Sequence, residues 1–474
     1  MSTKQCKSAA TVVTGSAHAD HIRGSFGATV YLELGRAFGR VLCLLLCLIS
    51  LQSHAELWSF GGDDGKEEHA PPWVVQGDET FIDQYHGSFP SAHSNGPNSF
   101  LSTPENSFSN ILGLQLGFDL GNQGEFWFRE ETIRGIPLSN AGGLGALTNN
   151  DMQRYMTNTF VTYLALGFYT RVVNFGGESD SLPMASHQFD RAVDSHRLTW
   201  TIGKVDVLSY FDGNAYAHKS DDQFLNWCFM TSCAYDYAAD SRGYTWGASS
   251  ELTWDRWSAR FGWFAMPVLP NQLALDPAMG EHFGVNGEIE RRWDTGALKL
   301  LMYQGRMQLA NFGSYLNQTG IFIANQPRYN AIRGGGGLNL QQALAPGVGL
   351  FARAFWTGGS NESMAFTEVD RSFSAGLSLD GQNWGRSRDG IGLGWALNQI
   401  SGARQAFLTA GNYDLFIGDG YLMYAPEYVL ETYYKWGIVD GVHLTADWQH
   451  VANPAYNQLR GPIDVYGLRL HIDF

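Results

Sequence analysis

The stretch LGLQLGFDLGNQGEFWF, residues 112–128, alternates apolar residues with small or polar residues on both sides of a turn. Leucine or phenylalanine occupies every second position from Leu112 to Leu120, and glycine, glutamine or aspartate stands between them. Alternation with a period of two is typical of a β-strand with one apolar face, because successive side chains point to opposite faces. The glycine-rich segment 121–124 marks a turn. The stretch therefore predicts a β-hairpin.

The same alternation recurs along most of the chain. It is clearest over residues 244–254 with 257–263, and over 372–379 with 391–397. Further candidate strands are 159–172, 196–206, 283–293, 297–307, 347–356, 426–436 and 441–450. Aromatic residues gather at the strand ends, and Gly, Ser and Thr fill the polar face, as in a membrane barrel with a wet lumen. We expect an all-β fold, a transmembrane antiparallel β-barrel, because an open sheet edge cannot persist in hydrocarbon.

Composition excludes several other classes of protein. The chain has 474 residues, a formal net charge of −15, 16% charged and 14% aromatic residues, and a mean hydropathy of −0.20. A helical membrane protein would be more apolar, and a disordered chain would lack the aromatic residues. The negative charge argues against nucleic acid as a partner, since phosphate binding needs clustered Lys and Arg.

An export signal precedes the strands. The apolar run Val41–Leu51 follows Arg36 and Arg40 and ends before Ser53-His54-Ala55, a small-x-small cleavage site. We therefore expect residues 1–55 to be an N-terminal extension and signal peptide, cut after Ala55. Residues 56–105 are predicted to form a periplasmic segment, and residues 106–474 the barrel. Removal of 1–55 takes away five basic and two acidic residues, so the charge becomes −18.

Two cysteines, Cys228 and Cys233, remain after that cleavage. An even pair in an exported chain suggests a disulfide that closes a short loop, and two separate buried thiols are the alternative.

The last predicted strand, YGLRLHIDF at 466–474, places apolar residues at every second position and ends on Phe474. It resembles the signal by which outer-membrane barrels are recognised for insertion. We therefore expect Phe474 to act in assembly, with the barrel-assembly machinery as a partner.

Polar and aromatic residues are mixed densely between 204 and 247, as in FDGNAYAH at 211–218 and DYAADSRGYTWG at 236–247. Carboxylates, amides and aromatic rings together are typical of a sugar-recognition surface. The alternative is an ordered loop whose polar groups satisfy one another.

These motifs, with QFLNW at 223–227, GPNS at 96–99, Arg353 within LFARAFW and the ending PAYNQLRGPIDVYGLRLHIDF, are similar to those of the OprB-type carbohydrate-selective outer-membrane porins. The resemblance covers about Gly77 to Phe474. It implies a 16-stranded barrel in the bacterial outer membrane, with short periplasmic turns and long extracellular loops, that passes sugars by passive diffusion. Lys219-Ser220 departs from the family pattern, where an acidic residue and proline are expected.

Candidate site residues come from two arguments. The strand phase predicts that Gln115, Asp119, Arg260 and Arg353 face the lumen. The resemblance implies that further residues line or brace a constriction. These are Lys204, Asp206, Asp212, Asn214, Asn226, Trp227, Asp236, Asp240 and Arg242, with Glu130 and Glu131 as weaker additions.

Two other functions stay open. A polysaccharide export channel would share the fold, and a barrel enzyme would need a nucleophile–base pair or an acidic dyad. The sequence carries no G-x-S-x-G or H-E-x-x-H motif, so we expect no enzyme, no cofactor and no dedicated metal site. Expected partners are sugars as permeants, outer-membrane lipid and lipopolysaccharide. The oligomeric state is expected to be a monomer or a homotrimer.

Overall fold

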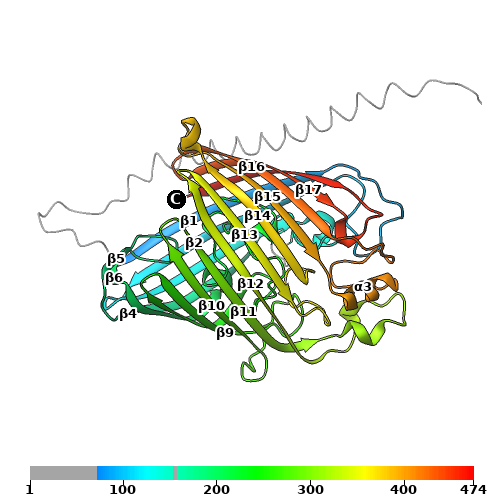
Figure 1. The fold of residues 1–474 in the computed structure, drawn as a ribbon, viewed down its shortest axis with the longest axis horizontal. Coiled ribbons are helices and arrows are strands. Elements are labelled where there is room, and N and C mark those ends of the chain that lie inside the picture. The colour runs from blue at the N-terminus through cyan, green and yellow to red at the C-terminus, as the bar shows by residue number, and fades with distance from the viewer. Residues whose placement is uncertain (1–71, 153–156) are drawn as a thin grey trace, which may run out of the picture. The chain divides into compact units, whose positions relative to one another are not determined.

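Sixteen antiparallel strands close into a barrel in the computed structural model, which describes residues 72–152 and 157–474 (Figure 1). The predicted fold class and strand number are confirmed. The first eight barrel strands are β1 (Trp73–His86), β2 (Glu105–Asp119), β3 (Gly124–Ile136), β4 (Val161–Asn174), β7 (His196–Asp206), β8 (Tyr244–Trp254), β9 (Trp257–Ala265) and β10 (Phe283–Trp293). The other eight are β11 (Gly296–Leu309), β12 (Tyr329–Ala345), β13 (Val348–Thr357), β14 (Arg371–Asp380), β15 (Gly390–Gln399), β16 (Glu427–Val439), β17 (Val442–Ala452) and β18 (Ile463–Asp473).

The barrel closes between its first and last strands. β1 pairs with β18 from Asp78↔Asp473 to His86↔Val465, and Phe474 exchanges backbone hydrogen bonds of 2.7 and 2.8 Å with Gly77. The expected start of the barrel at residue 106 is therefore too late, because Trp73–His86 is one of the sixteen strands. The strand escapes detection because Glu79 and Asp83 stand where its apolar face should be. The expected signal peptide, residues 1–55, lies outside the described residues.

The two ends of the barrel differ in the length of their connections. At one end, here the turn end, most connections are short: 120–123, 255–256, 294–295, 346–347 and 440–441. Two are longer: 175–195 holds a hairpin of β5 (Ser179–Leu182) and β6 (Arg191–Asp194), and 381–389 holds the 3₁₀ helix η6 (Gly381–Trp384). The loop end carries all the other connections, including α3 (Gly402–Thr409).

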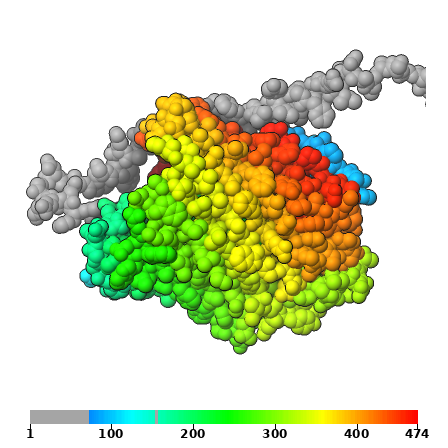
Figure 2. Space-filling view, in the orientation of Figure 1, coloured from blue at the N-terminus to red at the C-terminus, as the bar shows by residue number. Residues whose placement is uncertain are grey.

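Each strand presents one face outward. On β9, Trp257, Phe261 and Trp263 are exposed, whereas Ser258 and Phe264, at alternate positions, are buried. Side chains cover the outer surface from β9 to β16 without an opening (Figure 2). No helix within the described residues is long and apolar enough to cross a membrane.

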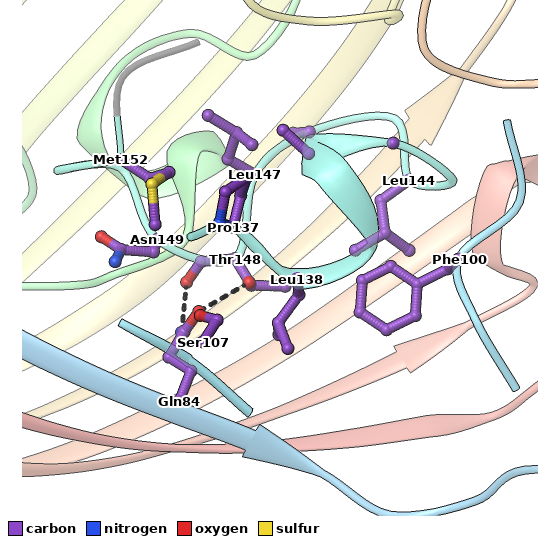
Figure 3. Close-up of a pocket in the computed structure, with 13 residues that line it drawn as sticks. Gln84, Phe100, Ser107, Pro137, Leu138, Leu144, Leu147, Thr148, Asn149 and Met152 are labelled. Atoms are coloured by element: carbon purple, nitrogen blue, oxygen red, sulfur yellow. Dashed lines mark hydrogen bonds between the residues drawn. The ribbon is translucent and has the colours of Figure 1, made fainter. Parts of the chain in front are cut away.

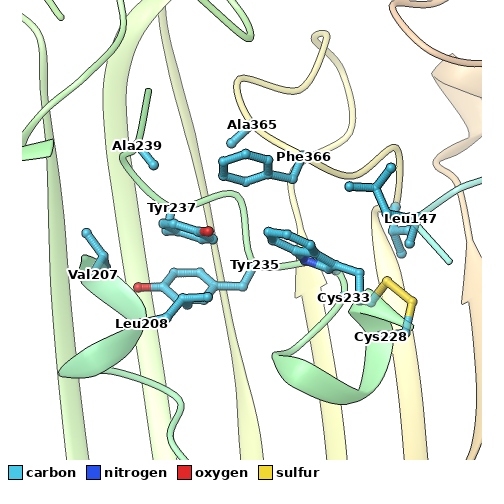
Figure 4. Close-up of a cluster of buried hydrophobic side chains, with 14 of the residues drawn as sticks. Leu147, Val207, Leu208, Cys228, Cys233, Tyr235, Tyr237, Ala239, Ala365 and Phe366 are labelled. Carbon is cyan, nitrogen blue, oxygen red and sulfur yellow. A yellow bond between two sulfur atoms is a disulfide. The ribbon is translucent and has the colours of Figure 1, made fainter. Parts of the chain in front are cut away.

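Two long connections fold inward. The lumen loop, residues 207–243, links β7 to β8 and contains η3 (Val207–Ser209) and α2 (Trp227–Met230). The companion loop, residues 137–152, follows β3 and contains η2 (Leu138–Ala141). Side chains of both loops join the main hydrophobic core, where Leu147, Tyr237 and Phe366 gather beside the Cys228–Cys233 bond (Figure 4). The core of this barrel therefore lies inside it.

Candidate functional site

Arg353 of β13 holds the lumen loop from the barrel wall. Its guanidinium donates to the carbonyls of Phe229 (2.7 Å) and Ala217 (2.6 Å), and its Nε lies 3.5 Å from Asp212 Oδ2. The side chains of Arg353 and Asp212 are each only 1% exposed. This arginine thus joins three separate segments of the loop to one strand.

Asp212 is itself fully hydrogen-bonded. It accepts from the Ser232 amide (2.5 Å), the Thr231 hydroxyl (2.8 Å) and Asn339 of β12 (2.8 Å). Burial alone would raise the pKa of Asp212, but Arg353 and these hydrogen bonds hold the pKa below its usual value. Asp212 is therefore a carboxylate at neutral pH and balances the Arg353 charge.

Other strands attach the rest of the loop to the same side of the barrel. Arg333 of β12 pairs with Asp236 at 2.7 Å. Glu431 of β16 accepts from the amides of Leu225 (2.6 Å) and Asn226 (2.9 Å). Arg469 of β18 donates to the loop carbonyls of Ser220 and Gln223, each at 2.8 Å. The lumen loop is thus fixed to the wall formed by the second half of the chain.

The short helix α2 is stabilised locally. The Asn226 side chain accepts from the Cys228 amide and caps the helix, and the Trp227 ring stacks on Phe366 with centroids 4.8 Å apart. Cys228 and Cys233, both buried, form a disulfide within the loop. This bond links two positions five residues apart and restricts the backbone between them.

We expect a direct chemical readout of this disulfide. The mature protein should take up two alkyl groups only after denaturation and reduction, and none after denaturation alone. Mass spectrometry of the purified barrel measures this. Alkylation without reductant would show two free thiols and contradict the pairing.

A partly exposed charge cluster lies on the opposite side of the lumen. Arg129 of β3 forms two bonds to Asp78 of β1 (2.5 and 2.8 Å) and one to Glu131 (3.0 Å). Glu131 also accepts from the hydroxyls of Tyr163 (2.5 Å) and Tyr244 (2.6 Å). The side chains of Asp78 and Arg129 keep 20% and 13% of their surface exposed. We call these five residues the eyelet cluster.

Carboxylates from both inward loops extend this cluster. Asp151 belongs to the companion loop and Asp221 to the lumen loop, where the Asp221 side chain is 44% exposed. Asp151 Oδ2 is buried and has no hydrogen-bond partner in the described part of the chain. Burial, with the charges of Glu131 and Asp221, raises the pKa of Asp151 to about 7.

A small cavity lies between the companion loop and strands β1 and β2, and no residue of the eyelet cluster lines it (Figure 3). Gln84 crosses it, donating to the Thr148 carbonyl and accepting from the Thr148 hydroxyl, both at 2.9 Å. The space open to the centre of a water molecule is about 20 Å³. The cavity can therefore hold a water molecule but not a sugar.

The residues singled out from the sequence fall into distinct places. Asp212, Asn214, Asn226, Trp227, Asp236 and Arg353 lie in the attachment of the lumen loop to the wall. Asp206 and Asp240 accept hydrogen bonds from nearby amides at the two ends of that loop. Arg242 lies 4.0 Å from the centroid of the Tyr163 ring, next to the eyelet cluster, which contains Glu131.

Three further predicted residues lie apart from the loop attachment. Arg260 faces the lumen on β9 and pairs with Glu251 (2.7 Å), Glu288 (2.5 Å) and Glu290 (2.7 Å). Gln115 is buried and bonded to Gln76 at 2.7 Å. Asp119 ends β2 and accepts from the amide of Gly121 in the turn.

Two predicted residues fall on strand positions that point outward. Lys204 follows the exposed Ile202 in phase, but its ammonium donates to the Leu164 carbonyl at 2.6 Å and lies 5.9 and 5.7 Å from the Tyr163 and Tyr244 ring centroids, beside the eyelet cluster. Glu130 is exposed on the outer face of β3.

Sequence reasoning missed Asp78, Arg129, Asp151 and Asp221. Arg129 could have been found, because it continues the inward phase of the opening hairpin, two positions after Trp127. Asp78 could not have been found, because its strand, β1, was not predicted from the sequence.

A closed barrel with apolar outward side chains, short turns at one end and a loop folded into its lumen defines a porin, a channel of the outer membrane. The family model for carbohydrate-selective porins of the OprB family matches residues 108–474. The chain therefore belongs to the OprB family, and it is a sugar-selective channel of the bacterial outer membrane.

A solved structure with a TM-score above 0.5 supports the fold. The high-pH structure of Pseudomonas putida OprB has a TM-score of 0.63 at 15% identity, covering 85% of this chain and 94% of that one. The outer membrane channel DcaP of Acinetobacter baumannii gives a TM-score of 0.48 at 7% identity, covering 86% and 99%. The comparison with curated proteins gives no match. The family and the fold are those of a channel.

Proposed function

We propose that sugars cross this barrel by passive diffusion through the space between the lumen loop and the eyelet cluster. One observation carries the proposal. The lumen loop is attached to strands β10–β18, whereas the eyelet cluster on the other side of the lumen keeps charged side chains partly exposed. A narrow pore selects by its radius and by the hydrogen-bonding groups that line it.

The chemistry of the eyelet cluster suits neutral polyols. The Asp78 carboxylate accepts and the Arg129 guanidinium donates, so a sugar can exchange hydrogen bonds with water for hydrogen bonds with both. Tyr163 and Tyr244 orient Glu131 through their hydroxyls, and the Arg242 and Lys204 side chains lie against their rings. In this proposal Glu131 and Arg242 line the passage. Asp212, Asn214, Asn226, Trp227, Asp236 and Arg353 brace it by holding the lumen loop.

Liposome swelling tests the proposal. Purified barrel should admit monosaccharides faster than disaccharides, and Arg129→Ala should change the sugar rates, because it widens the passage and removes the donor. Arg371→Ala, on the exposed outer face of β14, is the matched control and should leave the rates unchanged. Conductance without any sugar uptake would overturn the proposal and would favour the export channel.

The Asp151 carboxyl gives the pore an expected pH dependence. Because its pKa is raised to about 7, it is neutral well below pH 7 and carries a negative charge above it. Cation preference should therefore rise as the pH passes through this pKa, with the change centred near pH 7.

Reversal potentials in a salt gradient measure that preference. Asp151→Asn should abolish the step, whereas Asp180→Asn, in the exposed β5 hairpin, should keep it. A step of the same size in Asp151→Asn would show that another group is responsible.

A further inference from the structure

Tyr216 of the lumen loop carries an aromatic ring that the attachment of the loop leaves unused. It belongs to the motif FDGNAYAH, in which the ring of Phe211 is fully buried in the core. The Tyr216 ring is partly exposed, and its hydroxyl makes no hydrogen bond within the part of the chain that the structure describes. A partly exposed ring with an unpartnered hydroxyl offers a ligand both an apolar face and a polar group.

The backbone on both sides of Tyr216 is fixed to the barrel wall. The Ala215 amide donates to Gln341 Oε1 of β12 at 3.0 Å. The Ala217 carbonyl accepts from Arg353 of β13 at 2.6 Å. A group that is already ordered loses little conformational freedom when a ligand packs against it. The Tyr216 ring is therefore held in position before any ligand arrives.

The wall beside this ring is reduced to glycine. Gly349 of β13 faces the lumen, and a Cβ at this position would lie 2.1 Å from Tyr216 Cε1. Such a contact is too short for two carbon atoms, so any other residue at position 349 would displace the ring. The Tyr216 ring thus rests directly on the strand backbone.

A groove opens beside the ring at the turn end of the lumen. Tyr216 and Gly349 line it together with Ser378 and Asp380 of β14 and the turn between β12 and β13. The space open to the centre of a water molecule is about 400 Å³. Sites for small organic ligands have volumes of about 300–1,000 Å³. The groove is therefore large enough for a monosaccharide, unlike the cavity beside Gln84.

The polar groups of the groove suit the hydroxyl groups of a sugar. Asp380 is exposed at the end of β14, and Gln382 Nε2 donates to its carboxylate at the long distance of 3.5 Å. The carboxylate therefore keeps acceptor capacity for a ligand. Burial, together with the Asp380 charge, raises the pKa of Tyr216, so its hydroxyl stays protonated at neutral pH and can donate. The ring adds an apolar face for the C–H groups of a pyranose.

We propose that this groove binds the ring of a neutral sugar at the turn end of the pore, and we call it the mouth site. It depends on the proposed function, because the sugar reaches it as the permeant. Asp380 is the one charged side chain among the described residues that line the groove, so a neutral sugar is favoured over a sugar acid or a sugar phosphate. The turn end of an outer-membrane barrel faces the periplasm, so the mouth site receives a sugar that has passed the eyelet cluster.

The mouth site differs from the eyelet cluster in its chemistry. Beside the eyelet cluster, the side chains of Arg242 and Lys204 lie against the rings of Tyr163 and Tyr244. No cation lies over the Tyr216 ring in the described part of the chain. The eyelet cluster therefore offers charged hydrogen-bonding groups, whereas the mouth site adds a ring on which a sugar can stack.

Paramagnetic broadening of sugar signals tests the position of this site. Cys228 and Cys233 are bonded to each other, so an introduced cysteine takes up a single nitroxide label. A label on Asn383→Cys, exposed in the turn beside the groove, should broaden the proton lines of D-glucose added to the purified barrel in detergent. The matched label on Gln318→Cys, exposed at the loop end, should not. Equal broadening by the two labels, or none by the first, would overturn the mouth site.

Variants at the ring test whether binding depends on Tyr216. In the labelled Asn383→Cys barrel, Tyr216→Leu should lower the affinity for glucose about tenfold, or about 1.4 kcal/mol. Tyr216→Phe keeps the ring and should retain most of the affinity. Gly349→Ala should weaken binding as Tyr216→Leu does, because it displaces the ring. Wild-type affinity in Tyr216→Leu would contradict stacking on this ring, and Gly349→Ala gives the same test if Tyr216→Leu does not fold into a heat-modifiable barrel.

Liposome swelling with the wild-type barrel separates the mouth site from the proposed passage of sugars. Broadening by the Asn383→Cys label without any swelling would support the mouth site and overturn the proposed function. Swelling without broadening would support the proposed function and overturn the mouth site.

Discussion

Arg353→Ala is expected to release the lumen loop from β13, raise single-channel conductance and weaken the block of current by sugars. The guanidinium is buried and bonded to the carbonyls of Phe229 and Ala217 and to Asp212, so its removal leaves a buried carboxylate without a counter-charge. Breaking a buried ion pair in this way costs about 3–5 kcal/mol. At about 1.4 kcal/mol per factor of ten, the released loop should become about 10² to 4 × 10³ times more populated.

Planar-bilayer recording measures the conductance and the sugar block. The double variant Arg353→Ala/Asp212→Asn tests whether the unbalanced charge of Asp212 releases the loop. It removes that charge, so it should restore part of the wild-type conductance and sugar block. Arg371→Ala removes an exposed outward arginine and should change neither property. Wild-type conductance and block in Arg353→Ala would show that the loop stays in place without its arginine.

Phe474→Ala is expected to leave only a minor fraction of the chain as folded barrel in the outer membrane. The Phe474 ring lies over Gly77, where any Cβ would overlap it, and the two residues share both backbone hydrogen bonds at the end of the β1–β18 seam. Loss of the ring removes side-chain packing at the place where the barrel closes. Gly77→Leu should cause a milder loss of the same kind, because it displaces the ring and keeps Phe474.

The folded fraction is read as the heat-modifiable band in purified outer membranes. Phe373→Ala is the matched control, since it removes an exposed outward phenylalanine from β14, far from the seam. Equal yields for Phe474→Ala and Phe373→Ala would remove Phe474 from any special role in assembly.

Strand alternation predicted the barrel closely where one face is uniformly apolar. Residues 196–206, 244–254 and 283–293 coincide with β7, β8 and β10, and most other predicted strands are displaced by about three residues or fewer. The opening hairpin is longer than predicted, because β2 begins at Glu105 and β3 ends at Ile136. β12 was not predicted, because its alternation is interrupted by the four glycines 334–337. β1 was not predicted either. Glu79 and Asp83 occupy its outward positions, so the pattern that reports contact with lipid is absent there.

The candidate site was harder to predict, because loop residues have no period that relates them to the wall. Asp212 and Arg353 were both selected, but only the fold shows that they meet and hold the loop. The partners of the loop come from strands far along the chain, such as Glu431 and Arg469. Lys204 shows a different difficulty. It belongs to a polar motif, but its strand position points outward, and this cannot be seen from the motif alone.

The position of the lumen loop in the sequence limits when it can be attached to the barrel wall. Its partners Glu288, Asn339, Arg353, Glu431 and Arg469 all lie C-terminal to it, on strands that pair only when the second half of the barrel forms. The Cys228–Cys233 bond needs only five residues of separation and no strand. We therefore expect the attachment of the lumen loop to these strands to be completed only after the second half of the barrel has paired.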